Sequence, residues 1–242
     1  MKLKRYFTNA NLEKDIIVEI DGDEFHHMKN VMRTNVNDHV LLFNGTNIDA
    51  EGIVQSFQKN RAVIKIFETH INSNEPKINV TLYQAVCKGE KLSLITQKIT
   101  ELGASNMVVF YSDFTDIKEK TNKLDKLQKV SICASKQCGR SSILNIQGVV
   151  SFETMTSLLN KHQKVFVAYE NSTGYSLYDS LSTNNNLENI AIVIGAEGGF
   201  SEKEIKMLDE LNCEIVTLGK RILRTETASI VSVAQIMFAC EI

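Results

Sequence analysis

The chain has 242 residues, of which 43% are hydrophobic and 23% are charged, and its formal net charge is −2. This composition is typical of an ordered globular protein and excludes a fully disordered chain. No apolar stretch reaches the roughly 18 to 20 residues that span a bilayer, and the N-terminus lacks the apolar core of a secretory signal. The five cysteines include no CxxC pair, which is typical of reduced thiols. We therefore expect a cytoplasmic protein with no membrane partner.

The first 72 residues are rich in short β-type runs and contain one helical pattern. Asn44-Gly45 is a hairpin signal between two of these runs. Phe25, Met28 and Met32 recur at helical spacing and predict a helix over 23–32. The pattern therefore predicts a small β-barrel with strands at 16–20, 39–43, 48–57 and 62–67.

The single proline, Pro76, follows a polar, turn-forming stretch at 72–75. Such stretches join domains, so we expect a barrel domain at 1–72 and a second domain at 73–242. After Pro76 strand patterns alternate with helix patterns, which predicts an α/β domain with a mostly parallel sheet. The expected strands lie at 78–82, 108–111, 164–168, 190–194 and 214–218, and the expected helices at 92–102, 120–138, 202–211 and 227–239.

Charge is distributed unevenly along the chain. Residues 77–140 hold 11 lysines and arginines against 6 acidic residues, whereas residues 141–242 hold 7 against 12. A local basic patch can grip phosphates without making the whole chain basic. The lysine-rich stretch 118–140 is equally typical of a solvated helix face, since lysine is a good helix former. The residues alone leave both interpretations open.

The strongest local motif is an apolar strand that runs into a glycine-rich turn. Gly195-Ala196-Glu197-Gly198-Gly199 follows the apolar run 190–194 directly. Glycines at the carboxyl end of a strand let backbone groups approach a ligand closely. Ser201 and Glu204 have the spacing of a capping box that opens the next helix. The motif is neither GxGxxG nor a P-loop. It predicts a ligand site of another kind, although a plain tight turn would look the same.

A second strand, at 214–218, leads into the string GKRILRTETA at 219–228 and then into an apolar helix. Two such turns can form opposite walls of one pocket, with Tyr169-Glu170 as a third wall after another strand. Packing alone does not explain so many charged and hydroxyl groups directly before an apolar helix, which favours a ligand site. The alternative interpretation is an elaborate N-cap of that helix. The helix at 227–239 is apolar nearly all round, so we expect a second copy of the chain to bury one of its faces.

The strings IGAEGGFS at 194–201 and LGKRILRTETA at 218–228 resemble the paired signatures of the ribosomal small-subunit RNA methyltransferase E family. Other blocks resemble the family in the same order, at 5–7, 27–33, 88–91, 97–98, 101–103 and 137–140. The resemblance covers the whole chain, and the second string is very specific.

The resemblance implies a SPOUT-class α/β domain whose S-adenosylmethionine site lies in a deep C-terminal trefoil knot, preceded by a PUA-like β-barrel that helps to hold RNA. It also implies methylation of uridine N3 in the 16S rRNA of the small ribosomal subunit, by a homodimer with its active sites near the interface. No metal is expected, because the adjacent His26-His27 and the pair Cys133 and Cys138 lack metal-ligand spacing.

Four side chains are candidates for activating uridine N3. Glu197 and Glu226 are possible bases, and Arg221 and Arg224 are possible stabilisers of the N3 anion; the residues alone do not rank them. The cofactor is expected to contact Tyr169, Glu170, Ile194, Gly195, Glu197, Gly198, Gly199, Leu218, Gly219, Ile222, Leu223, Arg224, Thr227 and Ala228. The RNA is expected to contact Arg5, Arg33, Lys88, Lys91, Lys136 and Arg140.

The chain departs from the family pattern at a few positions. Alanine at 196 and leucine at 144 stand where proline is usual, Cys138 replaces a typical serine, and Phe114 stands where an arginine is common. Two other functions fit parts of the sequence. A catalytically silent RNA-binding protein would use the barrel and the basic patch, and would not need the intact string at 218–228. A Rossmann-type oxidoreductase would carry its glycines after an early strand instead of in the last quarter of the chain.

Overall fold

The computed structural model describes residues 3–115, 124–183 and 186–241. The chain forms two compact units. The first comprises Met1–Glu75 and Ser135–Ile143, and the second comprises Pro76–Ala134 and Leu144–Ile242. The division falls at Pro76, close to the boundary expected after residue 72. Residues 135–143 return to the first unit, which the sequence pattern does not reveal.

The first unit contains five strands, which are β1 (Lys4–Phe7), β2 (Ile17–Asp21), β3 (His39–Phe43), β4 (Ile48–Phe57) and β5 (Arg61–Ile71). They form one sheet in the order β1-β3-β4-β5-β2. Only β1 and β3 run parallel; the other neighbours are antiparallel. In β2, Val18 and Ile20 are buried and their neighbours are exposed, because successive side chains of a strand point to opposite faces. The same core holds Tyr6, Met28 and Leu42.

In this unit the structure confirms the predicted hairpin, and it shows a different helix type in part of the predicted helix. Strands β3 and β4 flank Asn44-Gly45 and pair antiparallel, as predicted. The helix expected over 23–32 begins as α1 (Gly22–His26) and continues as a π-helical segment at His27–Val31. The Met32 amide donates to the His27 carbonyl oxygen over 2.9 Å, a bond across five residues instead of four. Within this segment Met28 is fully buried in the core of the sheet.

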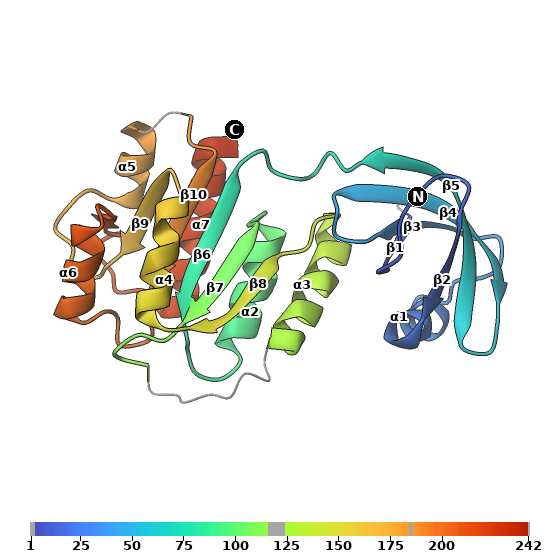
Figure 1. Ribbon diagram of the computed structural model, residues 1–242, viewed down its shortest axis with the longest axis horizontal. Coiled ribbons are helices and arrows are strands. Elements are labelled where there is room, and N and C mark those ends of the chain that lie inside the picture. The colour runs from blue at the N-terminus through green and yellow to red at the C-terminus, as the bar shows by residue number, and fades with distance from the viewer. Residues whose placement is uncertain (1–2, 116–123, 184–185, 242) are drawn as a thin grey trace. The chain divides into compact units, whose positions relative to one another are not determined.

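The second unit is built on a six-stranded sheet (Figure 1). Its strands are β6 (Asn79–Ala85), β7 (Asn106–Phe110), β8 (Asn145–Val150), β9 (Lys164–Ala168), β10 (Asn189–Ile194) and β11 (Glu214–Val216). Their order is β11-β9-β10-β6-β7-β8, and every pairing is parallel. A parallel sheet is covered on both faces, so its central strands are continuous apolar runs. Strand β10 is an example, since all but its first residue are buried.

Helices cover both faces of this sheet (Figure 1). Side chains of α2 (Lys91–Glu101), α3 (Leu124–Cys138), α5 (Leu177–Thr183) and α7 (Thr225–Glu241) pack into one core. Side chains of α4 (Phe152–Leu158) and α6 (Glu202–Glu210) pack into the core on the other face. A short 3-10 helix follows α4 at Leu159–Lys161. The α/β class and the parallel sheet agree with the sequence prediction, while the knot stays a prediction. No helix in the described ranges is long and apolar enough to cross a membrane.

Candidate active site

The site lies where the carboxyl ends of four neighbouring strands meet. The strand register places Ile194, the last residue of β10, beside Ala168 of β9 and Gln84 of β6. Val216 at the end of β11 pairs with Ala168 on the other side. Ligands of open parallel sheets bind in the crevice beyond these ends. Both loops singled out in the sequence, 195–199 after β10 and 217–224 after β11, therefore emerge at this edge.

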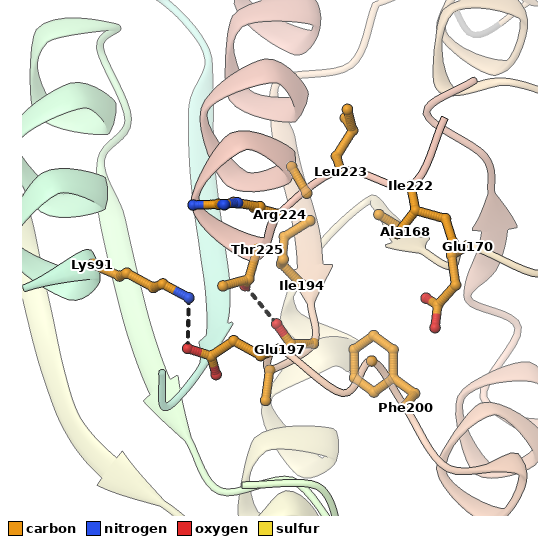
Figure 2. Close-up of a pocket in the computed structure, with 14 residues that line it drawn as sticks. Lys91, Ala168, Glu170, Ile194, Glu197, Phe200, Ile222, Leu223, Arg224 and Thr225 are labelled. Carbon is orange, nitrogen blue, oxygen red and sulfur yellow. Dashed lines mark hydrogen bonds and ion pairs between the residues drawn. The ribbon is translucent and has the colours of Figure 1, made fainter. Parts of the chain in front are cut away.

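The two loops enclose a cavity of about 370 Å³ (Figure 2). Its walls are formed by Lys91, Ala168, Glu170, Ile194, Gly195, Ala196, Glu197, Gly199, Phe200, Ile222, Leu223, Arg224, Thr225 and Ala228. A recess of about 80 Å³ adjoins it and adds Tyr169, Thr217, Leu218, Gly219, Lys220 and Arg221 to the walls. All of these residues belong to the second unit. The cavity has the size of a small-molecule site.

Glycine is required in the loop after β10 for steric reasons. A Cβ on Gly195 would lie 2.9 Å from the Gly199 backbone. Gly199 has a φ of +72°, and a Cβ there would overlap the Glu170 carboxylate. The Gly199 amide donates to the Ala196 carbonyl oxygen over 3.1 Å and closes the turn. The loop therefore presents bare backbone to the cavity, as the glycine motif predicts.

A capping box fixes the end of this loop, as the sequence predicts. Ser201 Oγ accepts from the Glu204 amide over 3.2 Å, and Glu204 Oε2 accepts from the Ser201 amide over 2.9 Å. Asp113, after β7, joins from a distant part of the chain. Its Oδ2 accepts from Ser201 Oγ over 2.6 Å, and its amide donates to Glu204 Oε1 over 2.9 Å. The turn after β7 is thus fastened to the start of α6.

A buried polar network ties the two cavity loops together. Thr225 Oγ1 donates to the Gly195 carbonyl oxygen over 2.7 Å and accepts from Gln84 Nε2 over 3.0 Å. Ser229 Oγ also contacts Gln84 Oε1. Gln84 and Ser229 are fully buried, and Thr225 is 5% exposed. The sequence analysis missed Gln84, although an amide near the carboxyl end of a strand that leads to the ligand edge is a usable signal.

An ion-pair cluster stands at one side of the cavity (Figure 2). Lys91 Nζ lies 2.8 Å from Glu197 Oε1 and 3.6 Å from Glu226 Oε2, and the Lys88 amide donates to Glu197 Oε1 over 2.9 Å. Burial by itself raises the pKa of Glu197, but the hydrogen bonds from Lys91 and Lys88 outweigh it, so this pKa lies below its usual value. The hydrogen bond to Glu197 raises the pKa of Lys91. Glu226 Oε2 is buried and accepts no hydrogen bond from any described residue.

The arginines predicted to stabilise charge differ in position. Arg224 lines the main cavity and Arg221 lines the recess, and both are exposed. Neither guanidinium forms an ion pair within the described parts of the chain. Ile222, which lies between these arginines in the sequence, lines both the cavity and the recess, and its side chain is 85% exposed. The loop thus offers positive charge and an apolar side chain to whatever enters.

Most residues predicted to contact a cofactor line the cavity or the recess, with two exceptions. Gly198 lines neither, and a Cβ on it would meet Phe114 Cβ at 2.9 Å. Thr227 is exposed in the first turn of α7 and also lies outside both linings. Lys91, predicted to contact RNA, is part of the cavity wall. Ala196 and Thr225 also line the cavity and belong to the two predicted turns, whereas Ala168 and Phe200 lie outside the predicted walls.

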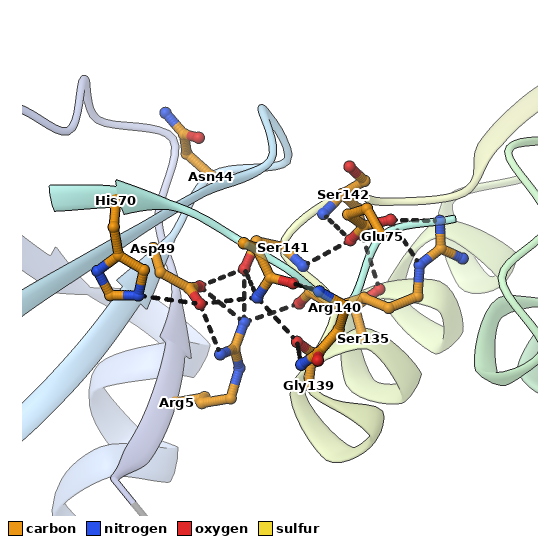
Figure 3. Close-up of polar contacts among 12 residues, drawn as sticks. Arg5, Asn44, Asp49, His70, Glu75, Ser135, Gly139, Arg140, Ser141 and Ser142 are labelled. Carbon is orange, nitrogen blue, oxygen red and sulfur yellow. Dashed lines mark hydrogen bonds and ion pairs between the residues drawn. The ribbon is translucent and has the colours of Figure 1, made fainter. Parts of the chain in front are cut away.

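Two cations predicted to contact RNA, Arg5 and Arg140, pair with acidic residues inside the first unit (Figure 3). Arg5 pairs with Asp49 at 3.0 Å and donates to the Arg140 carbonyl oxygen and Ser141 Oγ. Arg140 pairs with Glu75 at 3.0 Å and is 5% exposed. Their role here is to hold residues 135–143 on the sheet, so we do not assign them to an RNA surface.

The remaining predicted RNA contacts fall into three groups. Lys136 is mostly buried and pairs with Glu24 at 2.9 Å. Arg33 and Lys88 are exposed. The lysines at 118–123 lie outside the described residues. Among the residues that are described, no group of three or more His, Cys, Asp or Glu side chains is arranged to hold a metal ion.

Known proteins are similar to this chain over nearly its full length and in both of its domains. The family model described as an RNA methyltransferase domain matches residues 73–237, and an RNA methyltransferase PUA domain matches residues 20–67. The Bacillus subtilis protein named ribosomal RNA small subunit methyltransferase E is 31% identical, over 99% of this chain and 98% of the relative. The protein of the same name from Rickettsia conorii is 29% identical, over 98% and 96%.

A solved structure agrees with these sequence matches. A ribosomal RNA small subunit methyltransferase E from Neisseria gonorrhoeae, bound to S-adenosyl methionine, matches with a TM-score of 0.89 at 26% identity and covers 99% of this chain and 98% of that one. The matches confirm the PUA-like N-terminal domain and the α/β methyltransferase domain inferred from sequence. The chain therefore belongs to the ribosomal RNA small subunit methyltransferase E family.

Proposed function

We propose that this protein transfers the methyl group of S-adenosylmethionine to N3 of a uridine in the 16S rRNA of the small ribosomal subunit. The observation that carries the proposal is the convergence of the loops 195–199 and 217–224 on one cavity. A relative of the same fold holds S-adenosyl methionine, and the curated relatives are named for small-subunit ribosomal RNA. Such a substrate would place the activity in the cytoplasm.

The cavity walls fit this cofactor chemically. Ile194, Ile222 and Leu223 provide apolar surface suited to an adenine ring. Glu170, which also lines the cavity, has a carboxylate that would accept hydrogen bonds from ribose hydroxyls. The bare backbone of 195–199 would hold the polar amino-acid part. When bound, S-adenosylmethionine supplies an electrophilic methyl group on a sulfonium.

The protein's own task is to position the acceptor and favour its N3 anion. The proton on uridine N3 is only weakly acidic, so cations near the site and a proton acceptor both contribute. Arg224, exposed at the cavity, is the proposed partner of the developing negative charge. Glu197 is the proposed anchor of Lys91, because its carboxylate already accepts from Lys91 and Lys88. Glu226, whose buried Oε2 lacks a hydrogen bond, is the proposed proton acceptor.

A homodimer with composite active sites remains part of the proposal. Val233, Ile236 and Met237 of α7 are buried within the subunit, whereas Phe238 on the same helix is 70% exposed. Ile222 at the cavity is also exposed. Such side chains favour burial against a partner surface. A second copy that covered them would also enclose the cavity loop 217–224.

The activity is tested with purified protein, radiolabelled S-adenosylmethionine and small ribosomal subunits that lack the modification. Nucleoside mass spectrometry then identifies the methylated atom. We expect 3-methyluridine at one position of the 16S rRNA, and loss of label transfer in Glu226→Gln with cofactor binding retained. Glu226→Asp, which keeps the carboxylate, is the matched control and should retain part of the label transfer. Tight cofactor binding without label in any RNA would favour a silent RNA-binding protein instead.

A further inference from the structure

Phe114 is an exposed aromatic residue beside the glycine-rich cavity loop. It follows β7 and is 50% exposed. A Cβ built on Gly198 would lie 2.9 Å from Phe114 Cβ and 3.4 Å from its Cγ, so the side chain rests against the middle of the loop. Glu197 and Gly199, on either side of Gly198, both line the cavity. The ring therefore stands next to the cavity without being part of its wall.

The turn that carries Phe114 is fixed before any ligand arrives. The Thr115 amide donates to the Ser112 carbonyl oxygen over 3.0 Å, and the Ser112 amide donates to Thr115 Oγ1 over 3.0 Å. Asp113 is fastened on the other side to Ser201 and Glu204, which cap α6. An aromatic ring on a fixed turn loses little conformational entropy when it binds a partner.

The charges of this turn favour a base over a phosphate. The ionisable side chains that hydrogen-bond the turn, Asp113 and Glu204, are both carboxylates. Carboxylates repel a phosphate backbone, whereas a nucleobase presents a neutral aromatic face. RNA is recognised chiefly by unstacked bases that stack on aromatic side chains. An enzyme that draws a base out of its stack also removes a stacking partner from the flanking bases. A protein side chain can replace that partner.

We propose that Phe114 is the platform on which a nucleobase next to the target uridine stacks. The inference rests on the proposed function, because it assumes an RNA substrate at the cavity. The target base itself must enter the cavity, and Phe114 lies outside the lining, so the stacked base is a flanking one. The contact is a base contact and carries no counterion release.

Three variants separate stacking from packing against Gly198. Phe114→Leu keeps an apolar side chain on Gly198 but has no aromatic face, Phe114→Trp keeps the face, and Phe114→Ala removes both. A stacked base contributes about 1–3 kcal/mol, so we expect the KM for RNA to rise about 5- to 150-fold in the leucine and alanine variants. The tryptophan variant should match wild type. Affinity for S-adenosylmethionine and kcat should stay unchanged in the leucine and tryptophan variants, which keep the packing against Gly198.

Two further readouts complete the test. The slope of RNA affinity against salt should be the same in wild type and Phe114→Leu, since no phosphate contact is lost. An RNA fragment with 2-aminopurine beside the mapped uridine should be quenched by wild type and Phe114→Trp but not by Phe114→Leu. Wild-type RNA affinity in Phe114→Leu would contradict the stacking role of Phe114, and so would an equal loss of cofactor affinity in that variant. Neither result would contradict the proposed function. A wild-type protein that neither binds nor methylates RNA would overturn both.

Discussion

Thr225 Oγ1 donates a hydrogen bond to the Gly195 carbonyl oxygen across 2.7 Å and thereby joins the two loops of the cavity. The residues lie 30 positions apart, Thr225 at the start of α7 directly after the loop 217–224 and Gly195 on the loop after β10. Because Thr225 also accepts from Gln84 on β6, one buried hydroxyl fixes both cavity walls to the sheet. The shape of the cavity therefore depends on a contact that neither loop makes alone.

Thr225→Val removes this hydroxyl at nearly constant volume. The Gln84 amide and the Gly195 carbonyl each lose their bond to Thr225, although Gln84 Nε2 still donates to the Ala85 carbonyl oxygen, so we expect a cost of about 1 kcal/mol. We expect a lower free energy of unfolding in urea and at least about a tenfold loss of S-adenosylmethionine affinity by isothermal titration. Thr225→Ser keeps the hydroxyl and should retain most of the free energy of unfolding and most of the S-adenosylmethionine affinity. Full cofactor affinity in the valine variant would show that the loops do not need this tether.

Gly199→Ala tests the demand for bare backbone in the cavity. The added Cβ would displace the exposed Glu170 carboxylate from the cavity wall, at a residue whose φ is +72°, so we expect cofactor affinity to fall. Gly22→Ala is the control, because Gly22 has a φ of +56° and open space around its Cβ. The control carries similar backbone strain, about 1 kcal/mol, without the collision. Equal loss of cofactor affinity in both would refute the steric argument.

Lys91→Met tests the ion-pair cluster through its pH dependence. The folded pKa of Glu197 lies below the usual 4.5, so its ionised form adds stability above that value and loses it as the pH falls through the folded pKa. Without Lys91 the pKa of Glu197 should rise, and the acid limb of the methylation rate should move to higher pH. The pair is partly exposed, so the change in stability should stay below about 1 kcal/mol. An unmoved acid limb, measured at saturating cofactor, would exclude coupling of Glu197 to the reaction.

Arg140→Ala and Arg33→Ala should separate structural from RNA-binding cations. Arg140 and Glu75 form a buried pair, and removing one partner of such a pair costs about 3–5 kcal/mol. Arg33 is exposed, so Arg33→Ala should leave the midpoint of unfolding unchanged. The salt slope of RNA binding should instead fall by about one unit in Arg33→Ala. A normal unfolding midpoint for Arg140→Ala would contradict the structural role assigned to it.

Phe238→Ser tests the proposed dimer without damage to the core. Phe238 is 70% exposed, so the substitution should leave the subunit folded, whereas Ile236 is fully buried in the subunit and its replacement by a charged residue would unfold it. Sedimentation at micromolar concentration should give a dimer for wild type and a 27.2 kDa species for the variant. We expect methylation to fall with dimerisation. A wild-type monomer with full activity would rule the composite sites out.

The sequence by itself determined the elements whose signals are local. The β10 strand, its glycine loop and the Ser201–Glu204 capping box are each marked by a pattern within one short stretch of the sequence. The hairpin at Asn44-Gly45 and the alternation of strands and helices after Pro76 are local in the same sense. Elements with weak patterns were missed, such as β8, whose residues are only partly buried, and α4, which buries two side chains.

Only the tertiary structure decided which charged and polar side chains meet. Lysines and arginines have the same sequence signal whether they face solvent, line a cavity or pair inside a sheet. Lys91 pairs with Glu197, 106 residues away, and Arg5 donates to the Arg140 carbonyl oxygen, 135 residues away. Gln84 binds Thr225 across 141 residues. Such contacts exist only after the fold brings distant segments of the chain together, and those that become buried, such as Gln84 with Thr225, must then find hydrogen-bond partners.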